Sequence, residues 1–519
     1  MPNGIYYVGV QVDDGTNPPV TSYAIGQVTV TSSSMIKELN LGDLGNSVKG
    51  CTFEGMSFMG HLGQVMTGRF DMLSASGTPD NVSDFALVAP MADSHYSEDP
   101  EVGEVYVIFG WDSRFVMRSS AWYNGGRINV NQVGSDPDVP GFIAVGPSYI
   151  TKSLGITAIQ PLADLDTDLG SELMFGMPLL LNGVYEAQDY DPEPSGVLGA
   201  NGMFLNAPHA YPPAPAIPQP DYHDWYGGRV WSSGYIAVLA SSTPGLYNSA
   251  SSLGGVMHID EIGAAPGDPF RRDPHPRSIR YLQSGVRVYP HARPETNFDD
   301  FLNNDYRFGQ DLGIEDLDGD GTPDWLIAAP QNANDAGQID IGYSSLAWLW
   351  TQALPATATS YSWPYMIAPN NIDRYPLWPF GLIDNLRGDK LKAPSGHLGN
   401  PTGVGDFNGD RIGDIAASTP ASSNSGLRPN AGAAYLVFGR APFGDHSVGE
   451  IKDPVVLNAL PGIAIYGTAA GDRVGEKMTA LGRPNYGMVG HPRLRDFNGD
   501  GIPDWVISAP GRASPDQGR

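Results

Sequence analysis

The stretch Asp316-Leu-Asp318-Gly-Asp320-Gly321-Thr-Pro-Asp324 decides the fold, because its pattern of acids occurs four times along the chain. In every copy, acid or amide side chains stand at positions one, three, five and nine, and a proline falls fourteen residues after the first acid. Ca²⁺ takes six to eight oxygen ligands, and a tight loop with this spacing supplies them. A glycine at position six permits the sharp turn that lets the ligands converge. The repeated pattern therefore predicts four calcium-binding loops.

We expect these side chains, joined by the backbone carbonyl of position seven, to bind Ca²⁺ at about 2.3–2.6 Å. In chain order the predicted ligands are Asp164, Asp166, Asp168, Gly170, Glu172, Asp316, Asp318, Asp320, Thr322, Asp324, Asp406, Asn408, Asp410, Ile412, Asp414, Asp496, Asn498, Asp500, Ile502 and Asp504. The loop at Asp406 is expected to be the weakest, because Arg411 replaces the turn glycine and adds a positive charge. The alternative is four hairpin turns with solvated acids. The recurring ninth-position acid, which a simple turn does not need, favours the metal.

The residues after each loop indicate strands and exclude EF-hands. An EF-hand needs a glutamate at position twelve followed by a helix, whereas position twelve is here Phe175, Ile327, Ala417 or Ile507. Short apolar runs closed by proline follow instead, as in residues 325–330, 415–420 and 505–510. Runs of this length predict buried strands, so each ion is expected between two adjacent strands.

The loop belongs to a larger repeat. An apolar residue and a glycine precede it in each copy, at Leu154-Gly155, Phe308-Gly309, Leu398-Gly399 and Val474-Gly475. Glycine-led strands are expected downstream, at 234–239, 337–341 and 432–439. A fifth, degenerate copy contains Leu62-Gly63, Asp71 to Asp84 and residues 85–90 and 103–110, but it lacks acids at the third and fifth positions. We assign it no metal.

This combination resembles the FG-GAP repeats of the integrin alpha-subunit propeller and its bacterial relatives. The resemblance rests on Phe308-Gly309, the four acidic loops and the closing Ala329-Pro330, Thr419-Pro420 and Ala509-Pro510, and it covers roughly residues 50 to 510. It implies an all-β, calcium-binding β-propeller with seven blades, although five repeats are recognisable. The spacing of 90 residues between the first acids at 316, 406 and 496 exceeds the roughly 40–50 residues of an ordinary blade, so long loops are expected.

Composition excludes some partners and favours a compartment. The net charge of −27 argues against nucleic acid, whose binding needs basic faces. No apolar run approaches the roughly 20 residues of a membrane-spanning helix. The loops hold fourteen of the 57 acids, and four Ca²⁺ would bring the net charge from −27 to −19. The single cysteine, Cys51, excludes an intrachain disulfide, and since calcium-binding modules are common outside cells, we expect an extracellular or cell-surface bacterial protein.

Two domains and two insertions are predicted. Residues 5–12 and 23–32 are expected to form a hairpin, interpreted as the end of an immunoglobulin-like β-sandwich over 1–33. The propeller is then expected over 34–519, within a fragment of a longer exported protein. Proline-rich and aromatic-rich insertions at 185–230 and 343–395 interrupt the repeat. Their segments 205–230 and 343–380 are expected to project and to supply the main contact surface.

No catalytic constellation is found: H-E-x-x-H, G-x-S-x-G and C-x-x-C motifs are absent from the sequence. We therefore expect a non-enzymatic extracellular propeller, without a membrane span in this stretch, that serves adhesion, partner binding or structural assembly. Its partner would be a protein, a glycan or another copy of itself. The alternative is the propeller portion of a secreted hydrolase or lyase that degrades polysaccharide. The four ions, about one per loop, are the only cofactor expected.

Overall fold

In the computed structural model the chain forms two compact units. Unit 1 comprises residues 1–53 and 118–128, and unit 2 comprises residues 54–117 and 129–519. The structure describes residues 4–12, 20–30, 50–55, 60–72, 79–93, 102–110, 124–146, 155–178, 235–241, 255–262, 285–288, 307–343, 366–367, 388–452, 460–481, 496 and 500–511, with gaps at 56–59, 81, 137, 163, 165–168, 260–261, 331–335, 424–427 and 441–442. The described residues hold strands and two short 3-10 helices but no α-helix, so the fold is all-β.

Unit 1 contains the predicted N-terminal hairpin. β1 (Gly4–Val12) pairs antiparallel with β2 (Val20–Val30), and the register shifts between Tyr7 and Gly9. β3 (Gly50–Glu54) and β7 (Asn124–Asn129) form a second two-stranded sheet, almost wholly within this unit. The hairpin is confirmed, whereas an immunoglobulin-like sandwich stays a prediction.

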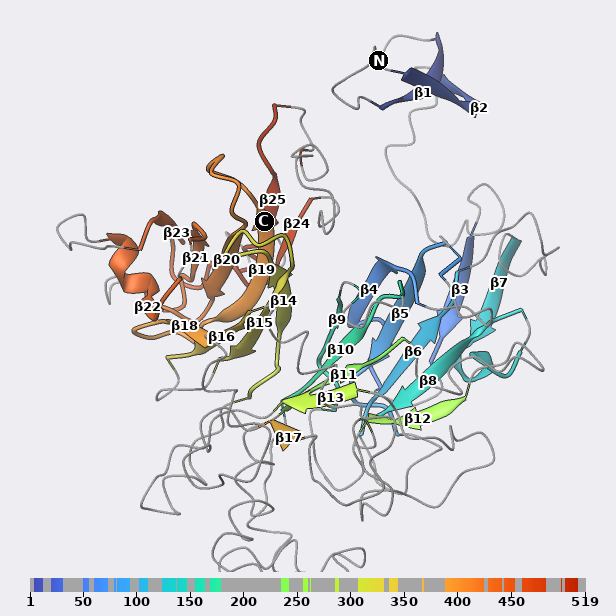
Figure 1. Cartoon of the computed structure of the whole chain (residues 1–519), viewed down its shortest axis with the longest axis horizontal. Coiled ribbons are helices and arrows are strands. Elements are labelled where there is room, and N and C mark those ends of the chain that lie inside the picture. The colour runs from blue at the N-terminus through green and yellow to red at the C-terminus, as the bar shows by residue number, and fades with distance from the viewer. Residues whose placement is uncertain are drawn as a thin grey trace, which may run out of the picture. The chain divides into compact units, whose positions relative to one another are not determined.

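Unit 2 repeats one antiparallel meander, and its strands can be followed by their labels in Figure 1. The first sheet holds β4 (Val65–Phe70), β5 (Asp84–Ala89), β6 (Glu104–Ile108) and β8 (Gly141–Val145). The second holds β9 (Ala158–Pro161), β10 (Leu173–Met177), β11 (Tyr235–Leu239) and β13 (Gly285–Val288). The third holds β14 (Leu312–Glu315), β15 (Asp324–Ala329), β16 (Gln338–Gly342) and β18 (Gly388–Lys392). The fourth holds β19 (Gly399–Gly405), β20 (Asp414–Thr419), β21 (Ala433–Val437) and β23 (Gly462–Tyr466), and β24 (Met478–Ala480) pairs with β25 (Trp505–Ile507).

The second strand of each sheet lies where the apolar runs predicted it. Every residue of β15 and of β20 is buried, and a proline follows each strand directly. Proline lacks the N–H that continues a sheet, which explains the sharp end. The prediction of a buried strand is wrong for β25, where the side chain of Val506 is 47% exposed. Trp505 of β25 packs against a small apolar cluster of the fourth sheet, whereas Val506, on the opposite face of the strand, is exposed, so only one face of β25 is covered.

A short fifth strand, which the sequence did not predict, is added to each of the first three sheets. β12 (Val256–His258), β17 (Met366–Ile367) and β22 (His446–Ser447) each pair parallel with the outer strand of a sheet. Each comes from the connection between the third and fourth strands of the following sheet. Two residues of the segment predicted as an insertion at 343–395 are thus held in a sheet through β17, and residues 388–392 of the same segment form β18, the fourth strand of the third sheet. The segment 205–230 lies outside the described residues, as does most of 343–380.

The two glycine-containing motifs of the repeat meet at the joints between sheets. Gly337, which leads β16, forms a parallel bridge with Leu398 of the next repeat, and Gly432 does the same with Val474. A Cβ on Gly337 would lie 2.1 Å from the backbone nitrogen of Leu398, and the residue has a φ of +86°. Only glycine tolerates both the contact and the conformation. The third strand of one sheet is therefore packed against the apolar-glycine turn of the next.

Successive sheets also share their cores. Contacts join the first strands in order, from β4 to β9, β14, β19 and β24. One buried apolar cluster spans the first and second sheets, and another spans the third and fourth. Neither a closed ring of sheets nor a set of seven blades is present among the described residues, so the propeller stays a prediction.

Candidate metal-binding loops

The loop 316–324 connects β14 to β15, and its own backbone orients its acids. Asp316 accepts the backbone N–H groups of positions four and six, at 2.8 and 2.9 Å. Asp318 accepts that of position five (3.1 Å), and Asp320 accepts that of position seven (2.7 Å). An ionised carboxylate has about four acceptor sites, so each acid keeps lone pairs for another ligand.

The loop 406–414, between β19 and β20, has the same hydrogen bonds. Asp406 accepts the N–H groups of positions four and six, at 2.6 and 2.8 Å. Asn408 accepts that of position five, and Asp410 accepts that of position seven, each at 2.9 Å. The frame is therefore set by the oxygen side chains at positions one, three and five, whichever residue stands between them.

The other two loops follow the frame where they are described. Asp496 accepts the N–H of position six at 2.6 Å, and Asp500 accepts that of position seven at 2.9 Å. Asp164 accepts the N–H of position six at 3.0 Å. Three of the predicted ligands in these two loops, Asp166, Asp168 and Asn498, lie outside the described residues, whereas Glu172 at position nine is described and fully buried.

All four loops turn through the left-handed region at position six. The φ angles are +88° at Gly321, +89° at Gly501, +77° at Leu169 and +75° at Arg411. The two glycines adopt this conformation freely, whereas a residue with a Cβ loses about 1–2 kcal/mol there. The sequence prediction of a sharp turn at this position is confirmed, and two loops form it without glycine.

The ninth-position acid has a structural role that sequence reasoning missed. Asp324 and Asp414 are fully buried, and each accepts the backbone N–H of position two, at 2.8 and 2.7 Å. Asp84 of the degenerate repeat makes the equivalent bond with Met72 at 2.9 Å. Asp414 and Asp84 also accept the N–H of a glycine just beyond the third strand of their sheets, at 2.9 and 2.7 Å. Because the bond persists in a repeat that lacks acids at the third and fifth positions, the recurrence of the ninth-position acid is not by itself a sign of a metal.

The acids of loop 316–324 fit one hard cation. Carboxylate oxygens of Asp316, Asp318 and Asp324 lie within 4.8 Å of one another. Two oxygens bound to one Ca²⁺ at about 2.3–2.6 Å can be separated by up to about 5 Å. The three side chains can therefore share an ion without moving apart, whereas Asp320 is exposed and is not a member of this group.

Burial and crowding make these carboxylates receptive to positive charge. Burial raises the pKa of Asp316, with repulsion from Asp320 and Asp318 acting in the same direction and two backbone N–H groups opposing it. Burial likewise raises the pKa of Asp318, again with repulsion from Asp320. A cation at the loop would relieve this repulsion.

The loop 406–414 differs in its third residue. The Asn408 side chain donates from Nδ2 to Asp410 Oδ2 at 2.9 Å, which occupies part of a carboxylate that would otherwise face an ion. An amide also brings no charge, and exposed Arg411 brings a positive one. Within the described residues, the carboxylates of this loop do not meet the spacing that groups the three acids of loop 316–324.

Adjacent loops are also tied to each other, through groups that the sequence analysis did not single out. Gly413, at position eight, donates its N–H to the Asp316 carbonyl at 2.7 Å, and Ser171 donates to the Asp71 carbonyl at 2.8 Å. Glu315 accepts the N–H of Gly405 at 2.8 Å. The other two loops have proline at position eight, which cannot donate. In the sequence, the alternation of proline with glycine or serine at position eight could have indicated which loops donate a hydrogen bond to a neighbour.

Comparison with known proteins leaves the loops as the main guide to function. A scan against protein-family models gave no match, and a search of curated proteins found no significant similarity. Among the described residues, no helix is both long and apolar enough to cross a membrane.

Proposed function

We propose that the chain is a calcium-stabilised β-propeller that works outside the cell as a non-enzymatic binding or assembly protein. The observation that carries this proposal is the hydrogen-bonded frame shared by the loops at 316–324 and 406–414, with three carboxylates gathered in the first of them. The order of contacts between successive first strands supports a propeller arrangement. The acidic composition and the FG-GAP resemblance support an extracellular role.

The residues of each loop would hold the ion and fix one strand connection. In loop 316–324 the ligands would be Asp316, Asp318 and Asp324, with Asp320 and the Thr322 carbonyl as further oxygens. A bound Ca²⁺ supplies positive charge that neutralises the crowded acids and joins the two ends of the loop. The N–H of Gly413 donates to the Asp316 carbonyl, so an ion that fixes loop 316–324 would also help to fix loop 406–414. The metal would therefore stabilise both the hairpins and the joints between sheets.

The direct test of this role is thermal unfolding with and without calcium. A ligand that binds only the folded state stabilises it by about 2.7 kcal/mol per site at a concentration 100 times its Kd. We expect EGTA to lower the melting temperature by several degrees while far-ultraviolet circular dichroism at 20 °C stays nearly unchanged. Adding back Ca²⁺ should restore the melting temperature, and equimolar Mg²⁺ should not, because Mg²⁺ loses its water reluctantly. An unchanged melting temperature in EGTA would contradict the proposal.

The proposed binding role has its own test. Deleting residues 205–230 or 343–380 should abolish partner binding or assembly and leave the calcium content intact, since neither segment contains a loop ligand. The second deletion also removes β17, so a variant that keeps Met366 and Ile367 between short linkers is the matched control. If both deletions bind and assemble like the parent, the contact surface lies elsewhere.

A further inference from the structure

The third position of loop 406–414 is an asparagine, Asn408, and the residue after it is Gly409. An asparagine that precedes a glycine is prone to deamidation, because the glycine has no side chain to keep its backbone nitrogen away from the asparagine amide. Both residues are exposed, and no neighbouring atom lies within 4 Å of the point that a Cβ on Gly409 would occupy. Packing therefore leaves this pair open to water and to ring closure.

Deamidation at this pair needs water as its only co-reactant. The backbone nitrogen of Gly409 attacks Cγ of Asn408, a C–N bond forms, and the side-chain nitrogen leaves as ammonia together with the proton of the attacking amide. Water then opens the resulting five-membered ring at one of its two carbonyls. Opening at the former side-chain carbonyl gives aspartate, and opening at the main-chain carbonyl gives isoaspartate. No oxidation or reduction takes place.

The hydrogen bonds of the loop oppose the first step. Gly409 donates its N–H to Asp406 Oδ1 at 2.6 Å, and repulsion from this carboxylate also disfavours a negatively charged attacking nitrogen. The Asn408 amide accepts the N–H of Asp410 through Oδ1 and donates to Asp410 Oδ2 through Nδ2, both at 2.9 Å. Ring closure requires the amide to turn toward the Gly409 nitrogen, which these bonds resist. The reaction is therefore expected when the loop opens locally.

We propose that Asn408 is a site of spontaneous deamidation, and that the hydrogen-bonded frame of the loop slows the reaction without abolishing it. The site follows from the exposed Asn408-Gly409 pair, and its slow rate follows from the bonds to Asp406 and Asp410. It goes beyond the proposed function, because the chemistry involves only groups of the chain itself and water.

The two products differ in what they do to the loop. Aspartate gives position three the side chain that Asp318 has in loop 316–324, and it ends the donation that occupies Asp410 Oδ2. Isoaspartate instead adds one carbon to the backbone, so the spacing of the frame is lost. The gain of calcium affinity in the aspartate product rests on the proposed function, and Asn408→Asp reproduces that product for its measurement.

Peptide mapping by mass spectrometry on the full chain tests the proposal, with all samples kept in EGTA buffer at pH 8 and 37 °C. The products at Asn408 should accumulate in the folded chain at least about tenfold more slowly than in guanidinium chloride, because two or three hydrogen bonds must break first. Asn408→Gln should give no product there, since glutamine would have to form a six-membered ring. Asn400 is the internal control, because the nitrogen of Pro401 has no proton to lose.

Asp406→Ala removes the acceptor of the Gly409 N–H and should speed the reaction about fivefold, as expected for one lost hydrogen bond. Asp164→Ala is the matched control, because it removes the first acid of another loop and should leave the rate at Asn408 unchanged. No product at Asn408 in the folded chain, equal rates in the folded and unfolded chains, or equal rates in Asp406→Ala and the parent would overturn the proposal. Because every sample is in EGTA, these outcomes do not depend on whether the loops bind calcium.

Discussion

The loops 316–324 and 406–414 have the same hydrogen-bonded frame but not the same capacity for a cation. In both, the first acid accepts two backbone N–H groups and the ninth acid is buried against position two. Position three is Asp318 in one loop and Asn408 in the other, and only the first loop brings three carboxylates within 4.8 Å. The frame thus follows from the spacing of oxygen side chains. Metal capacity depends in addition on how many of them are charged.

The largest expected effect is the loss of a ninth-position acid. Asp324→Ala and Asp414→Ala would each leave buried N–H groups without an acceptor and should cost about 3 kcal/mol in calcium-free buffer, read from urea unfolding. Asp84→Ala, in the repeat that lacks acids at the third and fifth positions, should cost a similar amount. In calcium, Asp324→Ala should lose about 3 kcal/mol more, whereas Asp84→Ala should not. Equal losses for both variants in calcium would show that Asp324 holds no ion.

A second test measures how stability depends on pH through Asp84, the ninth-position acid of the degenerate repeat. Burial raises the pKa of Asp84 to about 8, with repulsion from Asp71 and Asp80 acting in the same direction and two backbone N–H groups opposing it. In the unfolded chain the pKa of this carboxyl has its ordinary value of about 3.9. Between these two pKa values the folded state binds more protons than the unfolded state, so stability should fall as pH rises from about 4 to about 8.

The loss attributable to Asp84 cannot exceed about 1.4 kcal/mol per pH unit. Asp84→Asn should flatten the dependence in calcium-free buffer, as measured by urea unfolding at pH 5, 6 and 7. The comparison is the parent protein in the same buffers, because other acids contribute a background slope. A slope identical to that of the parent would show that Asp84 does not titrate in this range.

The sixth position allows a reciprocal exchange. Arg411→Gly should stabilise the protein by about 1 kcal/mol, because Arg411 has a left-handed backbone that glycine adopts without strain. Gly321→Arg should cost a similar amount, although no atom obstructs a Cβ at that position. Melting temperatures in calcium-free buffer with about 1 M NaCl, which screens the Arg charge, report mainly the backbone contribution. Opposite signs for the two exchanges are expected, and like signs would contradict the assignment of strain.

The smallest effect concerns the third position. Asn408→Asp should raise the calcium affinity of loop 406–414 about fivefold, and Asp318→Asn should lower that of loop 316–324 by a similar factor. Competition against a calcium-sensitive dye measures both changes. The hydrogen bonds of the frame should survive either exchange, since each new side chain keeps an oxygen for position five. If the calcium affinity of both loops stayed at its parent value, charge at the third position would not govern affinity.

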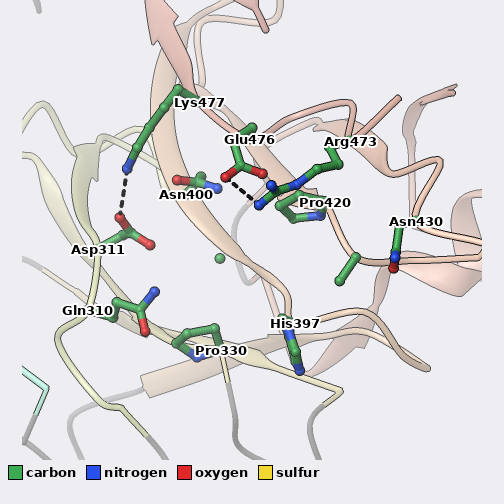
Figure 2. Close-up of a pocket in the computed structure, with 12 residues that line it drawn as sticks. Gln310, Asp311, Pro330, His397, Asn400, Pro420, Asn430, Arg473, Glu476 and Lys477 are labelled. Carbon is green, nitrogen blue, oxygen red and sulfur yellow. Dashed lines mark hydrogen bonds and ion pairs between the residues drawn. The ribbon is translucent and has the colours of Figure 1, made fainter. Parts of the chain in front are cut away.

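The sequence predicted the four long strands of each sheet better than the short parallel strands that are added to the sheet edges. Apolar runs closed by proline located β15 and β20, and glycine-led segments located β16 and β21, because these patterns are local. The short parallel strands β12, β17 and β22 have two or three residues each and no period to detect, and their pairing depends on the preceding sheet. The cavity lined by Gln310, His397 and Lys477 (Figure 2) could not be predicted either, since its walls come from turns about 80 residues apart.

The sequence identified acids that the fold brings together in the candidate site, but it did not identify the contacts that support them. Spacing alone identified Asp316, Asp318 and Asp324, which the fold brings together. The same spacing could not reveal that the ninth acid also accepts backbone N–H groups. Nor could it reveal that Glu315 links one loop to the next, because that contact joins two sheets. Such contacts depend on tertiary packing, which a periodic sequence pattern does not reveal.

The central claim is that the acidic loops bind calcium, and the calcium content of the protein tests it most directly. The protein is purified in calcium buffer, passed through a desalting column equilibrated with trace calcium, and analysed for metal by mass spectrometry against protein concentration. About four equivalents are expected for the parent chain, and about one fewer for the double variant Asp316→Asn with Asp318→Asn. Fewer than two equivalents in the parent, or no difference in the double variant, would contradict the account.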